Sequence, residues 1–528
     1  MLRFSALAFS YAAALTAAPS ITAIYNAASY APPSLPNSGI AQGSIFTLFG
    51  ATLGPNVAQA AATYPLATTQ GLGGTTVQVT VSGVTEDCVM LYASNPQVNA
   101  ILPSATPVGT GTLTVSFQGG SGSIPIQVLA ANFGAVTLNS AGSGPAVVTD
   151  ASYVPITMVN PAHPGQTLIL WGTGLGPITA SETVPPPEVD LGSGVQVFVE
   201  NQSAQVLYGG RSSSPGLDQI NFVVPEGAVG CKVSIAVVVK GVTGNVTTMS
   251  VAPAGQTTCG DEFGPLTTKN LQKALATGSL DLGAVDLYRV GDLSPMFVAG
   301  FGNYPVNTLI RSFAGSIGPS IGSCTAYEVF GTSFEVLDPY QPSYLDAGQQ
   351  LTLTAPGGLE TIPVLSSGAF SSALLNQPST FVQPGSYTVS NGSGGVQIGP
   401  FNWSLTLPDN VVPTNIPSSI NLSQDLTLTW SGGQAFPVVT IFGYAGVPVS
   451  STLNSYAEFI CNAAGSAGTF TIPSPFLKVI PPNGYGSVGV PGVNIQLAGI
   501  SSSSFNLSGV DEGFFTVYAS KGSVAKIQ

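Results

Sequence analysis

The sequence predicts an all-β chain, a tandem array of β-sandwich domains with one short helix linking them. Three observations predict this fold class. Gly and Pro contribute 64 and 42 of the 528 residues, and both are unfavourable inside helices. Short apolar runs and alternating runs recur between turn residues, as expected of strands. The third observation is an internal repeat with a period of about 120 residues, which is the size of a whole domain.

The low charge content excludes some classes of partner. Charged residues make up 7% of the chain, and the net charge is −13 with only 11 Lys plus Arg. Nucleic-acid binding needs clustered cations that displace phosphate counterions, and this chain has no such cluster. The same acidity disfavours docking onto an anionic membrane. An apolar content of 44% argues against disorder.

Residues 1–18 have the pattern of a secretory signal peptide. Arg3 supplies a positive charge, Phe4 to Leu15 an apolar stretch, and Ala14 to Ala18 a zone of small residues for cleavage. The apolar stretch is too short to span a bilayer, and no later segment reaches 18 uninterrupted apolar residues. We therefore expect an exported protein without a membrane span, secreted or held at the cell surface.

The repeat is visible as two similar stretches. Gly43 to Pro55 reads GSIFTLFGATLGP, and Gly165 to Pro177 reads GQTLILWGTGLGP. In each, an apolar run predicts a central strand, and the glycines that follow predict a tight turn. Gln97 to Asn99 returns as Gln219 to Asn221 at the same offset of 122 residues. Several matches at one offset indicate a duplicated domain.

We assign the two copies to residues 19–135 (the first copy) and 136–260 (the second copy). Thr76 to Val81 and Val195 to Val199 alternate apolar and polar residues, as strands with one wet face do. About seven short strands per copy, with turns every 8–12 residues, predict an immunoglobulin-like sandwich.

The motifs of the two copies resemble a known group of domains. They are NAASY at Asn26 to Tyr30, FGATLGP at Phe49 to Pro55, and NPQVNAILP at Asn95 to Pro103. The chain here is similar to IPT/TIG-type immunoglobulin-like domains, and more closely to the uncharacterised C-terminal domain family of secreted Solibacter-type acidobacterial proteins. The resemblance covers about residues 20–260. It implies export and modular display, and it brings no catalytic residues.

One helix is predicted in a linker at residues 261–278. In LTTKNLQKALAT, the apolar residues Leu271, Ala274 and Leu275 share a face, and Gly278 can cap the helix. Strand patterns resume after it. A Pro-rich stretch from Pro408 to Pro417 predicts a boundary between two further β-sandwich domains, at residues 279–410 and 411–528.

A weaker echo relates these last two regions. LTLTAPGG at Leu351 returns as LTLTWSGG at Leu426, and PGSYTV at Pro384 resembles AGTFTI at Ala467. The two offsets, 75 and 83, are unequal. Related units with different loops and independent strands of similar composition both explain the echo.

Five cysteines suit an oxidising compartment and leave one unpaired. Cys231 and Cys259 flank one predicted hairpin region, so we expect them to form a disulfide. Cys324 and Cys461 are a second candidate pair. Cys88 begins a predicted strand and is expected to be a small buried side chain.

The residues that could carry chemistry are few. His163, the only histidine, lies in a Pro- and Gly-rich loop without a nucleophile or carboxylate beside it, so we interpret it as a loop residue. Gly318 to Gly322 matches G-x-S-x-G, but Pro319 does not fit the strand–turn–helix of a nucleophile elbow. The densest acids are interpreted as solvated. They are Glu328, Glu335, Asp338, Asp511 and Glu512.

Contact residues are sought among the aromatic side chains. Tyr340 and Tyr344 in the loop DPYQPSYLD, and Trp430 beside two glycines, are the candidates for ligand contact, whereas Trp171 and Trp403 are expected in the core. No cofactor or metal site is predicted. Calcium is the one ion that loop oxygens such as those of Asp338 and Asp346 could bind, although the EF-hand spacing is missing.

The sequence therefore favours a secreted, non-enzymatic modular protein that binds or spaces an extracellular protein or polysaccharide. Catalysis needs titratable groups held at chosen pKa values, and this chain has few. A carbohydrate-binding accessory module of polysaccharide degradation is the first alternative, and it predicts solvent-facing aromatic side chains. A carboxylate-based hydrolase is the second, and it predicts two acids across a pocket.

Overall fold

The computed structural model describes residues 17–260, 264, 266–311, 318–331, 341–374, 377–487 and 489–528. Nearly all of the expected signal peptide therefore lies outside the described residues. Strands hold 51% of the chain and helices 5%, which confirms the predicted all-β class. In the part of the chain that the structure describes, no helix is both long and apolar enough to cross a bilayer.

The first copy is a sandwich of two five-stranded sheets around its own core. One sheet has the order β1 (Ser20–Asn26), β3 (Ile45–Ala51), β8 (Gln97–Ile101), β7 (Val89–Ala93) and β4 (Gln59–Ala60). The other has the order β2 (Ile40–Ala41), β10 (Gly120–Leu129), β9 (Gly109–Phe117), β5 (Thr75–Val81) and β6 (Val84–Asp87). The predicted alternation holds in β5, whose valines are buried while Gln78 and Thr80 are exposed.

The second copy folds around a separate core, with its strands hydrogen-bonded into one continuous ten-stranded ladder. Its main path is β11 (Gly134–Ala135), β13 (Thr167–Thr173), β17 (Asp218–Val223), β16 (Gln202–Arg211), β15 (Val195–Val199), β18 (Gly230–Val239) and β19 (Val242–Thr243). Beside this path lie β12 (Val148–Thr149), β14 (Val189–Asp190) and β20 (Thr247–Val251).

The repeated Leu-Gly-Pro turn has the same support in both copies. In the first copy the side-chain oxygen of Asn95 accepts a hydrogen bond from the backbone of Thr52 at 2.6 Å. In the second, Asp218 Oδ2 accepts from Gly174 at 2.7 Å and from Leu175 at 2.8 Å. The repeat thus encodes a strand, a turn, and an Asn or Asp that satisfies the turn's backbone donors.

A buried charge network joins the two copies. Arg211 is 0% exposed and donates to Asp218 at 2.7 Å, while Glu182 accepts a 2.5 Å hydrogen bond from Ser104 of the first copy. Gly43, also of the first copy, leaves room for the Arg211 side chain, because a Cβ at position 43 would lie 2.8 Å from the Arg211 guanidinium. Buried charges need such partners, so this network fixes how the copies meet.

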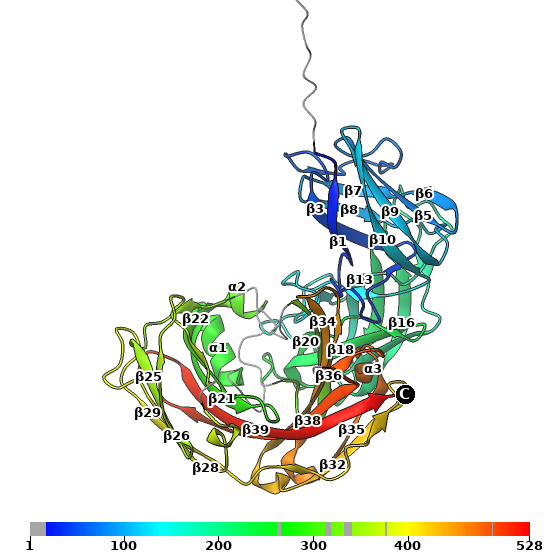
Figure 1. Cartoon of the computed structure of the whole chain (residues 1–528). Coiled ribbons are helices and arrows are strands. Elements are labelled where there is room, and N and C mark those ends of the chain that lie inside the picture. Colours follow the sequence, from blue (N-terminus) through cyan, green and yellow to red (C-terminus); the bar gives the residue numbers. More distant parts are fainter. Residues whose placement is uncertain are drawn as a thin grey trace, which may run out of the picture.

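The C-terminal half is built on one twelve-stranded sheet. Its main order is β23 (Ser323–Gly331), β34 (Asn454–Ala464), β33 (Val438–Pro448), β38 (Val493–Phe505), β39 (Glu512–Ile527), β21 (Ser279–Arg289), β22 (Met296–Pro305) and β24 (Ser343–Tyr344). Short partners are β27 (Phe370–Ala373), β31 (Ser419–Ile420), β36 (Tyr485–Ser487) and β37 (Val490–Pro491). In Figure 1 the sheet is curved, and β39 crosses it as one long red strand.

This sheet corrects the expected division at residues 410 and 411. β21, from residues 279–410, pairs in parallel with β39, from residues 411–528. β23 likewise pairs with β34 across that division. The two regions therefore share a sheet and cannot be separate sandwiches. The sequence suggests a boundary because Pro-rich stretches mark linkers, whereas pairing between distant strands leaves no local pattern.

Two smaller sheets cover the outer side of the large sheet. One has the order β26 (Gly358–Pro363), β25 (Gln350–Ala355), β28 (Gly385–Ser390) and β29 (Asn402–Leu407). The other has the order β30 (Val412–Pro413), β32 (Leu426–Ser431) and β35 (Thr469–Ile472). The echo seen in the sequence corresponds to two antiparallel pairs, β25 with β28 and β32 with β35.

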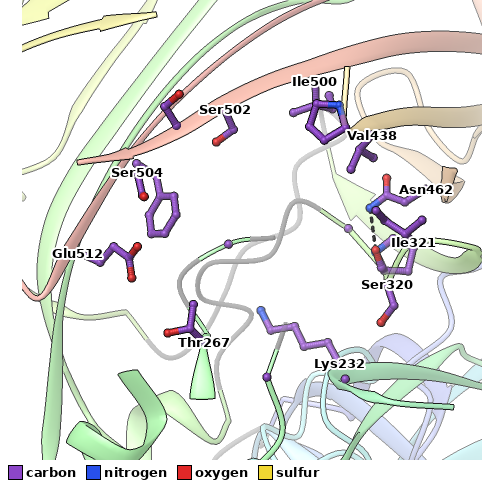
Figure 2. A pocket seen from close by; sticks show the side chains of 18 of the residues that line it. Lys232, Thr267, Ser320, Ile321, Val438, Asn462, Ile500, Ser502, Ser504 and Glu512 are labelled. Carbon is purple, nitrogen blue, oxygen red and sulfur yellow. Dashed lines mark hydrogen bonds between the residues drawn. The ribbon is translucent and has the colours of Figure 1, made fainter. Parts of the chain in front are cut away.

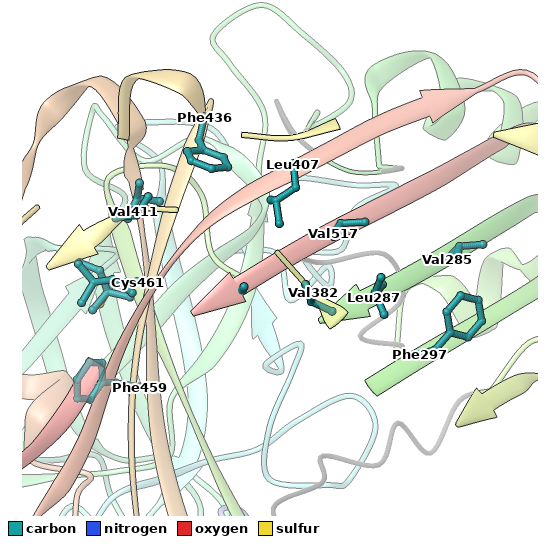
Figure 3. Packing of buried hydrophobic residues seen from close by; sticks show 14 of the residues in the cluster. Val285, Leu287, Phe297, Val382, Leu407, Val411, Phe436, Phe459, Cys461 and Val517 are labelled. Carbon is teal, nitrogen blue, oxygen red and sulfur yellow. The ribbon is translucent and has the colours of Figure 1, made fainter. Parts of the chain in front are cut away.

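The largest hydrophobic core lies between the large sheet and these outer sheets. Figure 3 shows part of it, including Val285, Val517 and Phe459 from the large sheet. Trp403 is buried as expected, with its ring stacked 4.4 Å from that of Phe401 and 4.9 Å from that of Phe505.

The predicted helix is α1 (Thr268–Thr277), which packs against β21 on the inner side of the sheet (Figure 1). Thr267 caps its start, and Gly278, with a φ of 86°, ends it in the left-handed conformation. Leu275 is exposed because this single-sided contact buries only Leu271, Ala274 and Asn270. The remaining helical segments are α2 (Val306–Leu309), α3 (Ser474–Leu477), η1 (Ser379–Phe381), η2 (Gly433–Ala435) and η3 (Gly465–Ala467).

Both predicted disulfides are present. Cys231 and Cys259 connect β18 to the segment before α1, with their Cα atoms 5.1 Å apart. Cys324 and Cys461 are directly opposed on β23 and β34, with their Cα atoms 4.0 Å apart. Cys88 is a buried free thiol, and burial raises its pKa well above the ordinary value.

A loop of the first copy, residues 31–39, contacts the C-terminal half. Leu35 is buried in the core of that half. The hydroxyl of Ser455 donates to the carbonyl of Pro33 at 2.5 Å, and Asn37 donates to the carboxylate of Glu328 at 2.8 Å. Direct contacts therefore run from the first copy to both other parts of the molecule.

We expect replacement of Cys324 and Cys461 by serine to lower the free energy of unfolding by about 5 kcal/mol, because the disulfide closes a loop of 137 residues. Replacing Cys231 and Cys259, which are 28 residues apart, should cost about 3.6 kcal/mol on the same basis. Urea unfolding of the oxidised proteins measures both. Equal losses would contradict the dependence on loop length.

We expect Asp218→Asn to destabilise the protein by about 3–5 kcal/mol, because it removes the carboxylate bonded to buried Arg211 at 2.7 Å and leaves Glu182, 4.0 Å away, as the remaining anionic partner. Asp190→Asn, in the same copy but with an exposed side chain, is the matched control and should cost less than about 0.5 kcal/mol. Thermal or urea unfolding measures both variants, and similar losses in the two would refute the role of the charge network.

Candidate functional site

A cavity of about 590 Å³ lies between the second copy and the inner face of the large sheet (Figure 2). Its size falls within the range of ligand pockets, roughly 300–1,000 Å³. Three walls form it: β38 and β39, the start of β18 with the N-cap of α1, and the loop that leads into β23.

The first wall follows from strand alternation. Ser502 and Ser504 of β38 and Glu512 of β39 line the cavity, while Phe515 and Val517 of β39 are buried in the core of the sandwich. The hydroxyls of Ser502 and Thr516 are hydrogen-bonded at 3.0 Å across the two strands. Ser502 and Ser504 thus place hydroxyl groups on the inner face, whereas the hydroxyl of Ser501 donates to the carbonyl of Thr406 of β29, in one of the outer sheets, at 2.8 Å.

The second wall brings a cation opposite this surface. Lys232, near the start of β18, and Thr267, the N-cap of α1, approach from the other side of the cavity in Figure 2. Glu512 accepts a hydrogen bond from Asn270 of α1 at 2.5 Å, so one end of its carboxylate is fixed. The cavity therefore holds a half-buried lysine and a half-buried carboxylate on different walls.

The third wall contains the G-x-S-x-G match. Asn462 of β34 donates to the carbonyl of Pro319 at 2.6 Å and so fixes the loop (Figure 2). Ser320 is followed by strand β23 rather than a helix, which confirms that this is no nucleophile elbow. The Ser320 hydroxyl instead bonds to the carboxyl of Glu200 in the β15–β16 turn.

The lining suits a polar ligand. Hydroxyls of Thr267, Ser502 and Ser504 offer hydrogen-bonding groups on two walls. The third wall adds the polar side chains of Ser320 and Asn462, which are bonded to Glu200, Pro319 and Thr440 within the protein. Among the described residues that line the cavity, Glu512 is the only carboxylate, and none is a histidine or cysteine. Such a surface can bind a hydroxyl-rich molecule, and its described residues do not include the paired acids of a glycosidase.

Of the three contact residues predicted from the sequence, the two that the structure describes, Tyr344 and Trp430, are not among the residues that line this cavity. Tyr340 falls outside the described residues. Tyr344 is half-buried, and its hydroxyl donates to Gln341 at 3.2 Å. Trp430 is only 6% exposed, so its prediction as a contact residue is wrong. The glycines after it let η2 fold back against the indole, whose Nε1 donates to the carbonyl of Gly465 at 3.4 Å.

The other candidate residues have local partners. The backbone N–H of His163 donates to the side chain of Gln166 at 3.0 Å, within its own loop, while the buried Nδ1 of the imidazole has no hydrogen-bond partner among the described residues. Asp511 forms an ion pair with Lys273 of α1. Asp346 Oδ1 accepts from Gly348 at 2.8 Å.

The acidic residues do not form a metal site in the part of the chain that the structure describes. Glu335 and Asp338 lie outside the described residues. The described ranges contain no group of three or more His, Cys, Asp or Glu placed to hold a metal ion.

Three glutamates outside the described cavity lining have raised pKa values: Glu200 is buried, and Glu328 and Glu458 are half-buried. Burial raises the pKa of Glu200 to about 7, although Ser320 donates to it. Burial also raises the pKa of Glu328 to about 7 and that of Glu458 to about 8. Glu458 lies on β34 between Tyr327 of β23 and Tyr444 of β33, on a tyrosine-lined row of the sheet.

No family model matches the sequence, and no curated protein matches it. Solved structures similar to this chain include domains 5–6 of the S-layer protein SbsC, at 16% identity, covering 45% of this chain and 99% of that one, with a TM-score of 0.16. Another is SGBP-B of the Bacteroides ovatus mixed-linkage glucan utilization locus, in complex with a mixed-linkage heptasaccharide. Its identity to this chain is 12%, the match covers 89% of this chain and 95% of that one, and the TM-score is 0.15.

The I9–I11 tandem of titin is a third similar structure, at 8% identity, with a match that covers 70% of this chain and 95% of that one and a TM-score of 0.12. TM-scores this low carry no argument about what the chain binds.

We expect the free energy of unfolding to fall as the pH rises from about 4.5 to about 8. A carboxyl whose pKa is higher in the folded state binds its proton more tightly there, so its stabilising contribution is complete below the unfolded value of 4.5 and is lost as the pH passes the folded value. Glu458→Gln should reduce the fall by about 2 kcal/mol, since partial exposure screens the full linkage value. Urea unfolding across this pH range measures it.

Glu226→Gln is the matched control, because Glu226 has an exposed side chain. It should leave the slope of stability against pH as it is in the unaltered protein. If Glu458→Gln left the slope of stability against pH unchanged, Glu458 would not be the group whose titration lowers the stability.

Proposed function

We propose that this chain is a secreted or cell-surface, non-enzymatic binding protein whose ligand is an extracellular carbohydrate. Two IPT/TIG-like copies and a fused double sandwich form its scaffold. The observation that carries the proposal is the cavity between the second copy and the large sheet, lined by hydroxyls, an amide and one charge of each sign.

The choice of carbohydrate rests on the chemistry of the lining. Sugars present many hydroxyl groups that donate and accept, and the walls offer serine and threonine hydroxyls that do both. Phe514, beside Glu512, adds an apolar ring on which the C–H face of a sugar can pack. The disulfides suit an oxidising extracellular compartment, where such ligands occur.

Binding is favoured over hydrolysis by the surroundings of the acids. Glycoside hydrolysis needs a second carboxyl about 5–9.5 Å from the first. Glu512 has no carboxylate partner among the described lining residues, and Asp511, its neighbour, is paired with Lys273. Glu200 is bonded to Ser320 of the cavity loop.

A spacer role is the second candidate, because specific contacts fix the parts of the molecule to one another. The Arg211 network joins the copies, and Leu35 joins the first copy to the C-terminal half. A spacer needs such rigidity and no ligand, so a binding measurement separates the two functions.

We expect the mature protein, residues 19–528, to bind at least one oligosaccharide in a glycan array, with the affinity measured by calorimetry. Ser502→Leu should weaken that binding at least tenfold, because the larger side chain fills the cavity and removes a hydroxyl. Ser523→Leu, at an exposed serine of β39 outside the lining, is the matched control and should bind normally. Absence of binding to every glycan would favour the spacer role.

A further inference from the structure

Outside the cavity, the second copy exposes a pair of aromatic rings. Tyr153 is 65% exposed and follows β12, while Trp171 lies on β13 and is half-buried. Their ring centroids are 6.1 Å apart, and the ring planes are inclined by 37°. We call Tyr153 and Trp171, with the loop Thr149 to Pro155, the aromatic corner.

The loop holds Tyr153 in place at a conformational cost. Asp150 Oδ1 accepts hydrogen bonds from Ser152 at 2.8 Å and from Val154 at 2.9 Å. Tyr153 itself has a φ of 63°, in the left-handed region that is uncommon for residues other than glycine. The five residues from Ala151 to Pro155 are all exposed. A strained backbone that presents a large ring to solvent suggests a functional surface.

Trp171 completes an apolar platform. Its Nε1 donates to the hydroxyl of Thr149 at 3.1 Å, so the polar atom of the indole is already satisfied within the protein. What remains accessible at the corner is ring surface, with the Asp150 carboxylate and the Ser152 hydroxyl at its rim. This combination of ring surface and polar rim matches a sugar, which has an apolar C–H face bordered by hydroxyls.

The first copy has an equivalent aromatic pair, Tyr30 and Phe49, which lies against another part of the chain. Tyr30 has a φ of 50° and stacks against Phe49 with centroids 6.5 Å apart. That corner is half-buried, and Tyr30 lines a small space together with Tyr327 and Glu328 of the C-terminal half. The first corner therefore meets a neighbour within the chain, whereas at the equivalent corner of the second copy Tyr153 is 65% exposed in the part of the chain that the structure describes.

We propose that the aromatic corner of the second copy is a second carbohydrate contact, binding a sugar ring of a neutral polysaccharide outside the cavity. This inference rests on the proposed function and extends it to a long ligand. The net charge of −13 disfavours acidic polymers. Two contacts on one polymer strengthen binding through effective concentration, so the corner should matter for polysaccharides and little for short oligosaccharides.

The test compares variants of the mature protein against a soluble β-glucan, xylan, galactomannan and α-glucan, by affinity electrophoresis and calorimetry. Tyr153→Ala should weaken polysaccharide binding about tenfold and change oligosaccharide binding less than twofold. Tyr153→Phe, which keeps the ring, should bind as the unaltered protein does. Tyr64→Ala is the matched control, since Tyr64 is 54% exposed on the first copy without a ring partner among the described residues.

The possible failures are distinguishable. If Tyr153→Ala binds polysaccharide normally while Ser502→Leu does not, the corner is no contact and the proposed function stands. If Ser502→Leu binds oligosaccharides normally, the proposed cavity site is wrong. Loss of self-association in Tyr153→Ala, measured by sedimentation with unchanged polysaccharide binding, would assign the corner to protein docking and overturn the inference. Circular dichroism melting checks that each variant is folded.

Discussion

The antiparallel pairing of β38 with β39 is the interaction on which the C-terminal half depends. β38 holds β33 and β34 on one side, and β39 holds β21 and β22 on the other, so one pair of strands joins two sandwiches. The same pair supplies core residues on one face and the cavity serines on the other. A register slip of one residue would exchange these faces and destroy both the core and the cavity.

The contacts between the parts of the chain decide what surfaces remain for ligands. The buried Arg211 network fixes the orientation of the second copy relative to the first, and Leu35 fixes the first copy to the C-terminal half. The start of β18 is thereby held over the inner face of the large sheet, where it closes the cavity. The same arrangement covers the Tyr30 corner and leaves the Tyr153 corner exposed.

Local features were predictable because they leave local patterns. Alternation identified β5 and β15, glycine and turn residues identified the repeated Leu-Gly-Pro turn, and one apolar face with a glycine cap identified α1. The division at residue 410 was wrong because the pairing of β21 with β39 joins positions over 200 residues apart. Lys232, Thr267 and Glu512 were missed as site residues, since none carries a motif and their meeting depends on that pairing.

The sequence by itself indicated the all-β class, the duplicated copies and the short helix, because each depends on composition or short spacing. It favoured the Cys231–Cys259 disulfide and left Cys324 with Cys461 as a second candidate pair, and the structure contains both. Only the tertiary structure decided which strands share a sheet, that Trp430 is buried, and where a polar cavity opens. Those outcomes depend on packing between segments that are far apart in the sequence. The packing energy depends on how two such segments fit together, so it cannot be read from the residues of either segment alone.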